Sequence, residues 1–439
     1  MNDRANPGEP KPGSDPAAAR RQSCDVLVIG GGPGGSAAAI FLARQGLQTV
    51  LVERDAHPRF HIGESLLPQS LPILDDLGVL QRVRETGVYK PGAEFISEDG
   101  RTEAIFEFRR ALLGGPTHAY QVLRSQFDEI LFRHAETCGV RTFERTAASV
   151  QDLQEEGAVV RTTGPDGEVI DWHTRFLVDA SGRSTLTAKM LAQKQPDPRN
   201  TSAAIFGHFH GIPGLEGARA GNIRIYLTNP GWMWQIPLPD GVTSVGLVAP
   251  GDYLRARGGS IEALFNAHVA RHPHIAAMLS EGSPAMRLQA TGNFSYRATE
   301  AAGASHIKVG DAYGFLDPIF STGVHLALTS AREAAAAVRD CLADPSRRLA
   351  RLAAYDRSIR RRLSFVSWFV YMIHDPAFRH LMLHPKNVLG VEFAVISLLA
   401  GDFNPNLRLR SRIALFKLLR YSFKFRSRVE SVADVDQAA

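Results

Sequence analysis

Residues 24–53 read CDVLVIGGGPGGSAAAIFLARQGLQTVLVE. The apolar run Asp25–Ile29 predicts a buried strand, and a glycine-rich turn then leads into a small-residue helix over Ser36–Gln45. A second apolar run, Gln48–Val52, predicts the next strand, and Glu53 closes it. A glycine-rich turn alone is weak evidence, but strand, turn, helix, strand and acid in this order predict a dinucleotide-binding βαβ unit.

The turn carries the GxGxxG pattern on Gly30, Gly32 and Gly35. Gly30 permits the tight turn, Gly32 lets a pyrophosphate approach the backbone, and Gly35 lets the helix pack close to the sheet. The helix start at Ser36 offers unpaired N–H groups and a positive dipole end to the phosphates. The Glu53 carboxylate suits a ribose diol and would repel a 2′-phosphate. Which dinucleotide binds stays open at this point.

Length and composition set the outer bounds. A chain of 439 residues with 44% hydrophobic and 22% charged residues can bury a large core and form two or three structural regions. The three cysteines are far apart and show no metal-binding spacing, so we expect no metal site, no disulfide framework and a cytoplasmic location. The net charge of +5 is mild, and no nucleic-acid-binding motif accompanies it.

Neither end of the chain carries a recognisable targeting or membrane segment. The first 23 residues are rich in Pro, Gly, Ala and charged residues, which predicts a disordered tail over 1–23 rather than a signal peptide. The apolar runs Phe365–Ile373 and Val388–Ala400 are too short to span a bilayer, so we expect no transmembrane segment.

The order of predicted elements indicates an α/β fold with an insertion. Strands of one nucleotide-binding sheet occur at the start, near residue 178 and near residue 308, a mostly antiparallel sheet is inserted between them, and helices close the chain. We therefore expect a discontinuous dinucleotide-binding domain, a substrate-side β-sheet domain and a C-terminal helical region. Their expected ranges are 24–93, 112–196 and 297–345 for the first, 94–111 and 197–296 for the second, and 346–439 for the third.

Two acids follow apolar strands, where the edge of a parallel sheet meets its ligand. Asp179 and Asp311 each end such a strand, and Arg124 lies on a predicted helix where it can pair with a pyrophosphate. Each residue alone is more often a surface or capping residue, but their order is informative. It resembles the FAD-dependent family of aromatic hydroxylases, halogenases and geranylgeranyl reductases over Cys24–Leu342. The matching motifs are GGGPGGS, Arg124–Asp128, DASGR at 179–183 and GDAYGFLDP at 310–318.

This resemblance implies a three-layer, Rossmann-like FAD-binding domain and FAD rather than NAD as the cofactor. Glu53 is then expected on the adenosine ribose and Asp311 on the ribityl chain. Arg54, Ser65 and Pro318 complete the expected cofactor contacts. Only one glycine-rich dinucleotide fold is visible, so a separate flavin reductase is expected to supply FADH2.

Residues 231–237 read GWMWQIP. Strand alternation puts Trp232, Trp234 and Ile236 on one face, and Pro237 ends the strand. Packing alone favours two tryptophans as core fillers. However, WxWxIP resembles the signature of flavin-dependent halogenases, and the resemblance implies that these side chains form a wall which keeps the substrate from the flavin and prevents its hydroxylation.

Lys90 lies in YKPGAEF, after the GES segment, and resembles the halogenase Lys-x-Gly-Ala pattern. Its ordinary interpretation is a solvated lysine before a turn. With WxWxIP present we assign it as the catalytic residue, which donates a hydrogen bond to hypohalous acid or, when neutral, is itself halogenated.

The segment PIFSTGVH at 318–325 starts the last long helix of the FAD region, where backbone N–H groups can bind an anion. The resemblance implies that Thr322 and Gly323 hold the halide, chloride or bromide. Halogenases of free tryptophan have a glutamate two residues before that threonine, and this chain has Phe320. The sequence thus resembles the halogenases of phenols and pyrroles, many of which act on carrier-tethered substrates. His325 is expected to be structural.

The resulting hypothesis is a FADH2-dependent halogenase of secondary metabolism, for example of antibiotic biosynthesis, that uses O2 and a halide on an electron-rich aromatic substrate. The alternatives are a FAD-dependent aromatic hydroxylase or epoxidase, a geranylgeranyl-reductase-like oxidoreductase, and a non-catalytic FAD-binding protein. The basic stretch Asn406–Arg428 is expected to be a solvated face, with docking to an acidic carrier protein or an anionic lipid as the alternatives.

Overall fold

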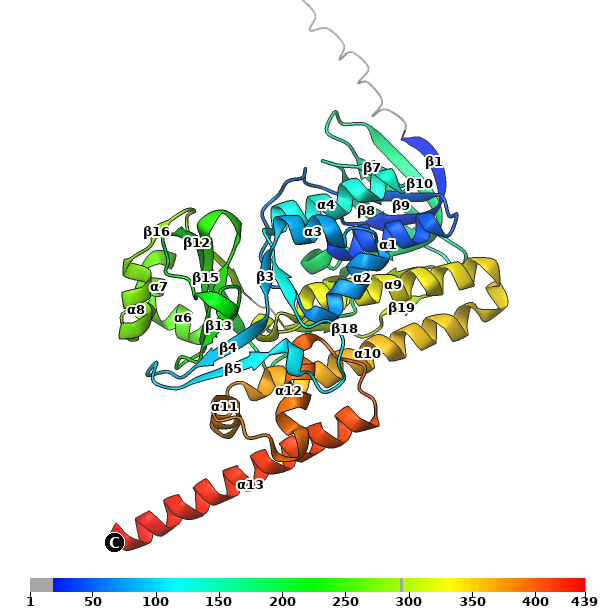
Figure 1. Cartoon of the computed structure of the whole chain (residues 1–439). Helices are drawn as coiled ribbons and strands as arrows, with labels where there is room; N and C mark the ends of the chain where they lie inside the picture. Colours follow the sequence, from blue (N-terminus) through cyan, green and yellow to red (C-terminus); the bar gives the residue numbers. More distant parts are fainter. Residues whose placement is uncertain (1–18, 293–294, 439) are drawn as a thin grey trace, which may run out of the picture.

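The dinucleotide fingerprint lies at the centre of a sheet in a computed structural model that describes residues 19–292 and 295–438 (Figure 1). Strand β1 pairs in parallel with β2 on one side and β10 on the other. Strand β7 pairs in parallel with β2 at one end of the sheet, β20 pairs in parallel with β10, and β19 pairs antiparallel with β20 at the other end. The strands of this sheet are β1 (Arg20–Ile29), β2 (Thr49–Val52), β7 (Arg141–Phe143), β10 (Val169–Asp179), β19 (Ala302–Gly303) and β20 (His306–Lys308), with β8 (Ala147–Leu153) and β9 (Ala158–Thr163) attached to it.

The start of β1 corrects the expected tail boundary. Arg20 already pairs with Ile170 of β10, so residues 20–23 belong to the sheet and not to a disordered tail. The first half of β10 pairs antiparallel with β9 and is therefore already extended, so residues 20–23 of β1 can pair with its other edge. The rest of the expected tail, residues 1–18, lies outside the described residues.

The parallel sheet is the middle one of three layers, because its strands are apolar on both faces and both faces are covered. Val26 and Val28 face the core under the helices, whereas Leu27 and Ile29 face the core under the antiparallel β8–β9 meander. The covering helices are α1 (Pro33–Arg44), α4 (Arg124–Thr137) and α9 (Thr322–Ala343). The small helices α2 (Leu71–Asp76), α3 (Leu80–Thr86) and α5 (Leu186–Met190) lie in the connections.

The inserted sheet forms the second domain and is mostly antiparallel, as expected, with one parallel pair between β13 and β4. One face joins the main core, and helices α6 (Gly251–Arg257), α7 (Ile261–Val269) and α8 (Pro273–Ser280) lie along the domain, α7 and α8 covering the other face. Its strands are β4 (Gly92–Ile96), β5 (Glu103–Glu107), β12 (Ser202–His210), β13 (Ile223–Tyr226), β14 (Trp232–Pro237), β15 (Val242–Pro250), β16 (Ser283–Pro284) and β17 (Gln289–Gly292).

The sequence predicts a single strand over Leu288–Tyr296, and this prediction is wrong. Its first part, β17, pairs with β12 of the inserted sheet, whereas Tyr296 begins β18 (Tyr296–Ala298), which pairs with β11 (Lys194–Pro196) and β21 (Gly314–Phe315). The two short strands thus belong to different sheets, which the local sequence pattern does not reveal.

The C-terminal region is helical, as its pattern predicts, and follows the α9 side of the molecule (Figure 1). Its helices are α10 (Arg348–Met372), α11 (Pro376–Leu383), α12 (Val391–Ala400) and α13 (Leu407–Ala438). Within residues 19–292 and 295–438 no single helix is long and apolar enough to cross a bilayer, although the bent pair Pro376–Leu383 and Val388–Ala400 meets that criterion jointly.

Candidate functional site

The three fingerprint glycines have different physical reasons to be glycine. Gly30 has φ +106°, and a Cβ there would lie 2.3 Å from the Ala180 carbonyl oxygen. A Cβ on Gly35 would lie 1.8 Å from the Gly30 oxygen. On Gly32 the nearest atom is a guanidinium nitrogen of Arg59, 3.6 Å away. The fold therefore requires Gly30 and Gly35, whereas the space in front of Gly32 is available to a ligand.

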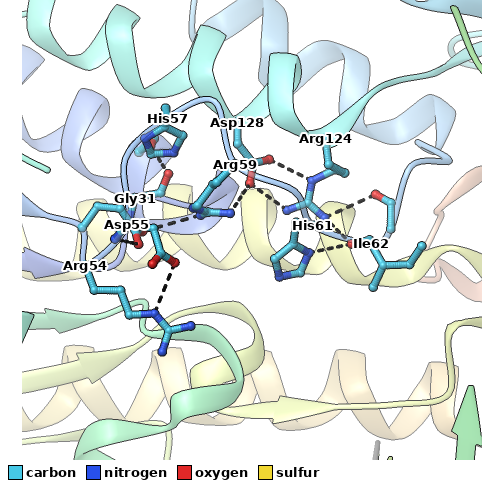
Figure 2. A network of polar contacts seen from close by, with 12 residues as sticks. Gly31, Arg54, Asp55, His57, Arg59, His61, Ile62, Arg124 and Asp128 are labelled. Atoms are coloured by element: carbon cyan, nitrogen blue, oxygen red, sulfur yellow. Dashed lines mark hydrogen bonds and ion pairs between the residues drawn. The ribbon is translucent and has the colours of Figure 1, made fainter. Parts of the chain in front are cut away.

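A buried polar network lies beside this turn (Figure 2). Glu53 Oε2 accepts from the Gly31 amide at 2.7 Å and lies 3.5 Å from Arg59 Nη2. Arg59 also reaches Asp128 Oδ2 at 3.2 Å. Arg124 donates to both oxygens of Asp128, at 2.8 and 3.0 Å, and to the Ile62 carbonyl at 2.7 Å. Arg124 thus holds the loop after β2, and its pairing with a pyrophosphate stays a prediction.

The charges in this network act on one another. The Arg124 guanidinium lowers the pKa of His61 to about 4, so His61 is neutral at pH 7. The pKa of Asp128 is lowered, because its arginine partners outweigh the burial that opposes ionisation. The network is therefore a fixed set of charges at neutral pH.

Other expected cofactor residues are placed around the same turn. Ser36 is buried and donates to the Gly31 carbonyl at 3.2 Å. Arg54 is exposed and lies 3.4 Å from the Asp55 carboxylate. Asp179, also expected at the ligand crevice, is instead held within the protein, accepting from the amides of Ser181 and Thr187 at 3.0 and 2.8 Å.

Asp311 lies in the short turn after β20. Burial raises the pKa of its carboxyl to about 6, and its backbone oxygen accepts from the Tyr296 hydroxyl at 2.8 Å. A half-buried carboxylate at the end of a parallel strand can accept from the hydroxyls of a ribityl chain. Pro318 begins a short 3-10 helix, Pro318–Phe320, directly before α9.

These residues fit FAD. The open space at Gly32 lies at the N-terminus of α1, where a pyrophosphate would accept hydrogen bonds from backbone N–H groups. Arg59 would add a positive charge there. Glu53, at the end of β2, would meet the ribose, and Asp311, after β20, would meet the ribityl chain. Bound FAD would supply redox chemistry at its ring.

The tryptophan wall is built as the strand alternation predicts. Trp232, Trp234 and Ile236 face the main core, whereas Met233 faces the core under α7 and α8. The two indole rings lie 5.7 Å apart. Pro237 is the last residue of β14.

Both indoles are held by hydrogen bonds, so they are both core fillers and fixed surfaces. Trp232 Nε1 donates to Asp317 Oδ1 at 3.2 Å, and Trp234 Nε1 donates to Ser244 Oγ at 3.1 Å. A Cβ on Gly246 of β15 would lie 2.2 Å from the Trp234 ring, so that glycine makes room for the indole.

Lys90 is almost completely buried, with 1% of its surface exposed. Its ammonium donates to Ser65 Oγ at 2.8 Å and to the Leu66 carbonyl at 2.9 Å, and it lies 5.2 Å from the centre of the Phe108 ring. The described residues place no carboxylate within ion-pair distance of it. Burial lowers the pKa of Lys90 to about 7. Ser65, which we expect to contact the cofactor, also accepts the hydrogen bond from this lysine.

The helix start at Thr322 and Gly323 has the expected conformation. Ser321 adopts the left-handed region with φ 55°, which ends the 3-10 helix and begins α9 at Thr322. A Cβ on Gly323 would meet only Phe315, at 3.7 Å. Phe320 is buried, and its ring lies 6.4 Å from that of Phe95.

His325 of α9, which we expect to be structural, lies between Ser70 and Thr329. It is buried, and burial lowers its pKa to about 3. Its ring nitrogens lie 3.3 Å from Ser70 Oγ and 3.5 Å from Thr329 Oγ1. A neutral, enclosed imidazole of this kind holds helices together and does not exchange protons near pH 7.

Arg59 was not identified from the sequence, because its partners Glu53 and Asp128 are brought together only by the fold. Asp128 and Asp317 lie in the motifs quoted above, but their contacts with Arg59 and Trp232 were not predicted. Across residues 19–292 and 295–438, no group of three or more His, Cys, Asp or Glu residues could hold a metal ion.

Comparisons with known proteins agree with this geometry. The family model for tryptophan halogenase matches residues 25–110 and 98–380. The chain is 36% identical over 349 residues to the flavin-dependent halogenase gsfI of Penicillium aethiopicum, covering 73% of this chain and 65% of the relative. It is 34% identical over 332 residues to a tryptophan 2-halogenase of Chondromyces crocatus, covering 73% of this chain and 62% of the relative.

The chain thus spans 62–65% of the length of these curated relatives, which is less than two thirds. Among solved structures, the flavin-dependent brominase Bmp2 superposes with a TM-score of 0.80 at 26% identity, covering 93% of this chain and all of the brominase. The family model and the fold together place the chain: it belongs to the tryptophan halogenase family of flavin-dependent halogenases.

Proposed function

We propose that this protein is a FADH2-dependent halogenase that uses O2 and chloride or bromide to halogenate an electron-rich aromatic ring of the phenol or pyrrole type. Bound FADH2 supplies the two electrons with which O2 and a proton convert halide to hypohalous acid and water. Family membership supports the reaction class, and the residues around Lys90 support the way in which it is carried out.

The buried amine of Lys90 carries the proposal. With a pKa of about 7 it is divided between ammonium and free amine at neutral pH. The ammonium donates a hydrogen bond to hypohalous acid, and the amine can accept the halogen as a nucleophile. Ser65 and the Leu66 carbonyl fix the nitrogen in place without neutralising it. A lysine with only a structural role would more often have a carboxylate partner.

The remaining residues take complementary roles. The amides at Thr322 and Gly323 bind the halide at the start of α9, where the helix dipole favours an anion. Trp232 and Trp234 separate the flavin side from the substrate side, so that the small hypohalous acid passes and the aromatic substrate does not. This separation favours halogenation over direct hydroxylation.

A small apolar cavity of about 20 Å³ lies beside Thr322 and is lined by that residue and eight apolar side chains, among them Phe320, Phe369 and Phe403. Lys90, Trp232 and Trp234 do not line it, so it belongs to the proposed halide side, where it has room for about one water molecule. The proposal of a phenol or pyrrole substrate is supported instead by Phe320, which stands where halogenases of free tryptophan have a glutamate.

The partners follow from the same reasoning. We propose a separate flavin reductase, because only one dinucleotide fingerprint occurs in the chain. The aromatic substrate is either free or tethered to a carrier protein, and both forms belong in the assay. The three cysteines are free, which supports a reducing, cytoplasmic location.

The test supplies FADH2 through a generic flavin reductase, with chloride or bromide, to the pure protein. Phenols and pyrroles are offered free and carrier-bound, and the products are analysed by mass spectrometry. We expect chlorine or bromine isotope patterns that require the protein. Hydroxylated products without halogen, formed while the pure protein oxidises NAD(P)H, would establish the hydroxylase alternative instead.

A further inference from the structure

The turn before the tryptophan wall is held from outside the sheet by the C-terminal region. This turn, Leu227–Gly231, joins β13 to β14 and delivers the chain directly into Trp232. Arg379 of α11 donates from Nη1 to the Thr228 carbonyl and from Nη2 to the Gly231 carbonyl, both at 2.9 Å. One guanidinium thus binds both ends of the turn.

The same arginine is anchored at its other edge. Arg379 Nε donates at 2.6 Å to the carbonyl of Ile373, the residue that caps the C-terminus of α10. A cation is favourable at a helix C-terminus, where carbonyl groups lack intrahelical partners. The flat, forked guanidinium can serve three converging carbonyls at once, and a lysine ammonium cannot match that geometry.

On its other side the turn packs directly against the inserted sheet, so it cannot shift in that direction if the contacts with Arg379 are lost. Gly231 has φ +99°, and a Cβ there would lie 2.0 Å from the Val248 carbonyl oxygen, so the turn presses directly on β15. Trp232 is then fixed at two ends, by this turn through its backbone and by Asp317 through its indole.

Asp317 links Trp232 to the proposed halide site at Thr322 and Gly323. Its carboxylate also accepts from the Ile319 amide at 3.2 Å and so caps the 3-10 helix that precedes Thr322. A continuous chain of contacts therefore runs from α11 through the turn, Trp232 and Asp317 to the start of α9.

We propose that Arg379 is a positioning residue that holds Trp232 in the wall and so determines how much of the oxidant ends in halogenated product. This role rests on the proposed halogenase function. Without the three hydrogen bonds the turn loosens, the Trp232 indole leaves the Asp317 carboxylate for part of the time, and the separation between flavin and substrate opens. Oxidant is then lost to hydrogen peroxide or to hydroxylation.

Arg420 offers a matched control. It is buried, lies in the same helical region, and pairs with Asp375, the N-cap of α11, at 2.7 Å, but it makes no contact with the turn. Like Arg379→Met, Arg420→Met removes a buried guanidinium, here the one with which α13 contacts the N-cap of α11. Any effect of Arg379→Met that Arg420→Met reproduces belongs to general loosening of α11.

The experiment has two readouts. The full chain is labelled with 5-fluorotryptophan, and the 19F resonances of its four tryptophans are assigned by Trp→Phe substitution. Arg379→Met is expected to shift or broaden the Trp232 resonance, Arg379→Lys to do so in part, and Arg420→Met to leave it unchanged. In the halogenation assay, Arg379→Met should lower halogenated product per FADH2 oxidised at least threefold, with FAD affinity within twofold of wild type.

An unchanged Trp232 resonance in Arg379→Met, an unchanged product yield, or the same changes in Arg420→Met would overturn the proposal. If the wild-type protein forms no halogenated product, the proposed function fails, and the 19F readout still decides whether Arg379 positions Trp232.

Discussion

At the scale of single residues, Lys90 shows what the sequence predicts and what it does not. The Lys-x-Gly-Ala resemblance pointed to this lysine, but its burial and its contacts with Ser65 and Leu66 come only from the fold. The contact between Arg59 and Asp128 was not predicted, because it joins residues 69 positions apart. Short motifs identify residues from their neighbours in the sequence. A network of side chains joins residues that are distant in sequence, and only the fold brings them together.

The buried amine has a consequence for stability. Its folded pKa of about 7 lies below the ordinary 10.5, so between these values the unfolded chain binds more protons and stability rises with pH. Below pH 7 the protein carries the full cost of a buried ammonium. Lys90→Met removes that cost and should stabilise the protein most at pH 6.5, with an advantage over wild type that shrinks by about 3 kcal/mol by pH 9.5.

Denaturant unfolding of both proteins at the two pH values measures this difference. Lys386→Met, at an exposed lysine, is the control and should show no such pH dependence. If the difference in the free energy of unfolding between Lys90→Met and wild type is constant over this pH range, the pKa of Lys90 is not lowered in the folded protein.

At the scale of elements, the βαβ unit was predicted because strand, turn and helix signals agree over a short stretch. Its helix begins at Pro33, three residues before the expected start, since the turn glycines themselves enter the helix. The expected strand over Leu288–Tyr296 failed for the opposite reason, because two short strands of different sheets adjoin there. Local patterns predict an element well and its partner poorly.

The glycines of this unit give a paired prediction. Gly32→Ala places a methyl group 3.6 Å from the nearest atom, so thermal stability should be unchanged, while FAD affinity falls at least tenfold because the methyl group meets the pyrophosphate. Gly35→Ala places a methyl group 1.8 Å from the Gly30 oxygen and should destabilise the fold by about 1–3 kcal/mol or more.

Thermal melts without FAD and titrations with FAD followed by flavin fluorescence separate the two effects. FAD affinity within twofold of wild type in Gly32→Ala would contradict the assignment of that space to the pyrophosphate.

At the scale of the whole molecule, the parallel sheet, the inserted sheet and the C-terminal helices follow the expected order along the chain (Figure 1). The way in which they meet was not predictable. The C-terminal helices line the apolar cavity beside Thr322 and also hold the turn before Trp232 through Arg379. Such contacts depend on the packing of distant surfaces, which leaves no local pattern in the sequence.

In the proposed mechanism, oxidation of halide and transfer of halogen occur at separate places, with Lys90 at the second. Lys90→Ala is supplied with FADH2, O2, halide and the aromatic substrate, and FADH2 consumption and halogenated product are measured together. We expect FAD binding and FADH2 oxidation close to those of wild type and no halogenated product. Halogenated product formed by Lys90→Ala at the wild-type rate would show that Lys90 does not transfer the halogen.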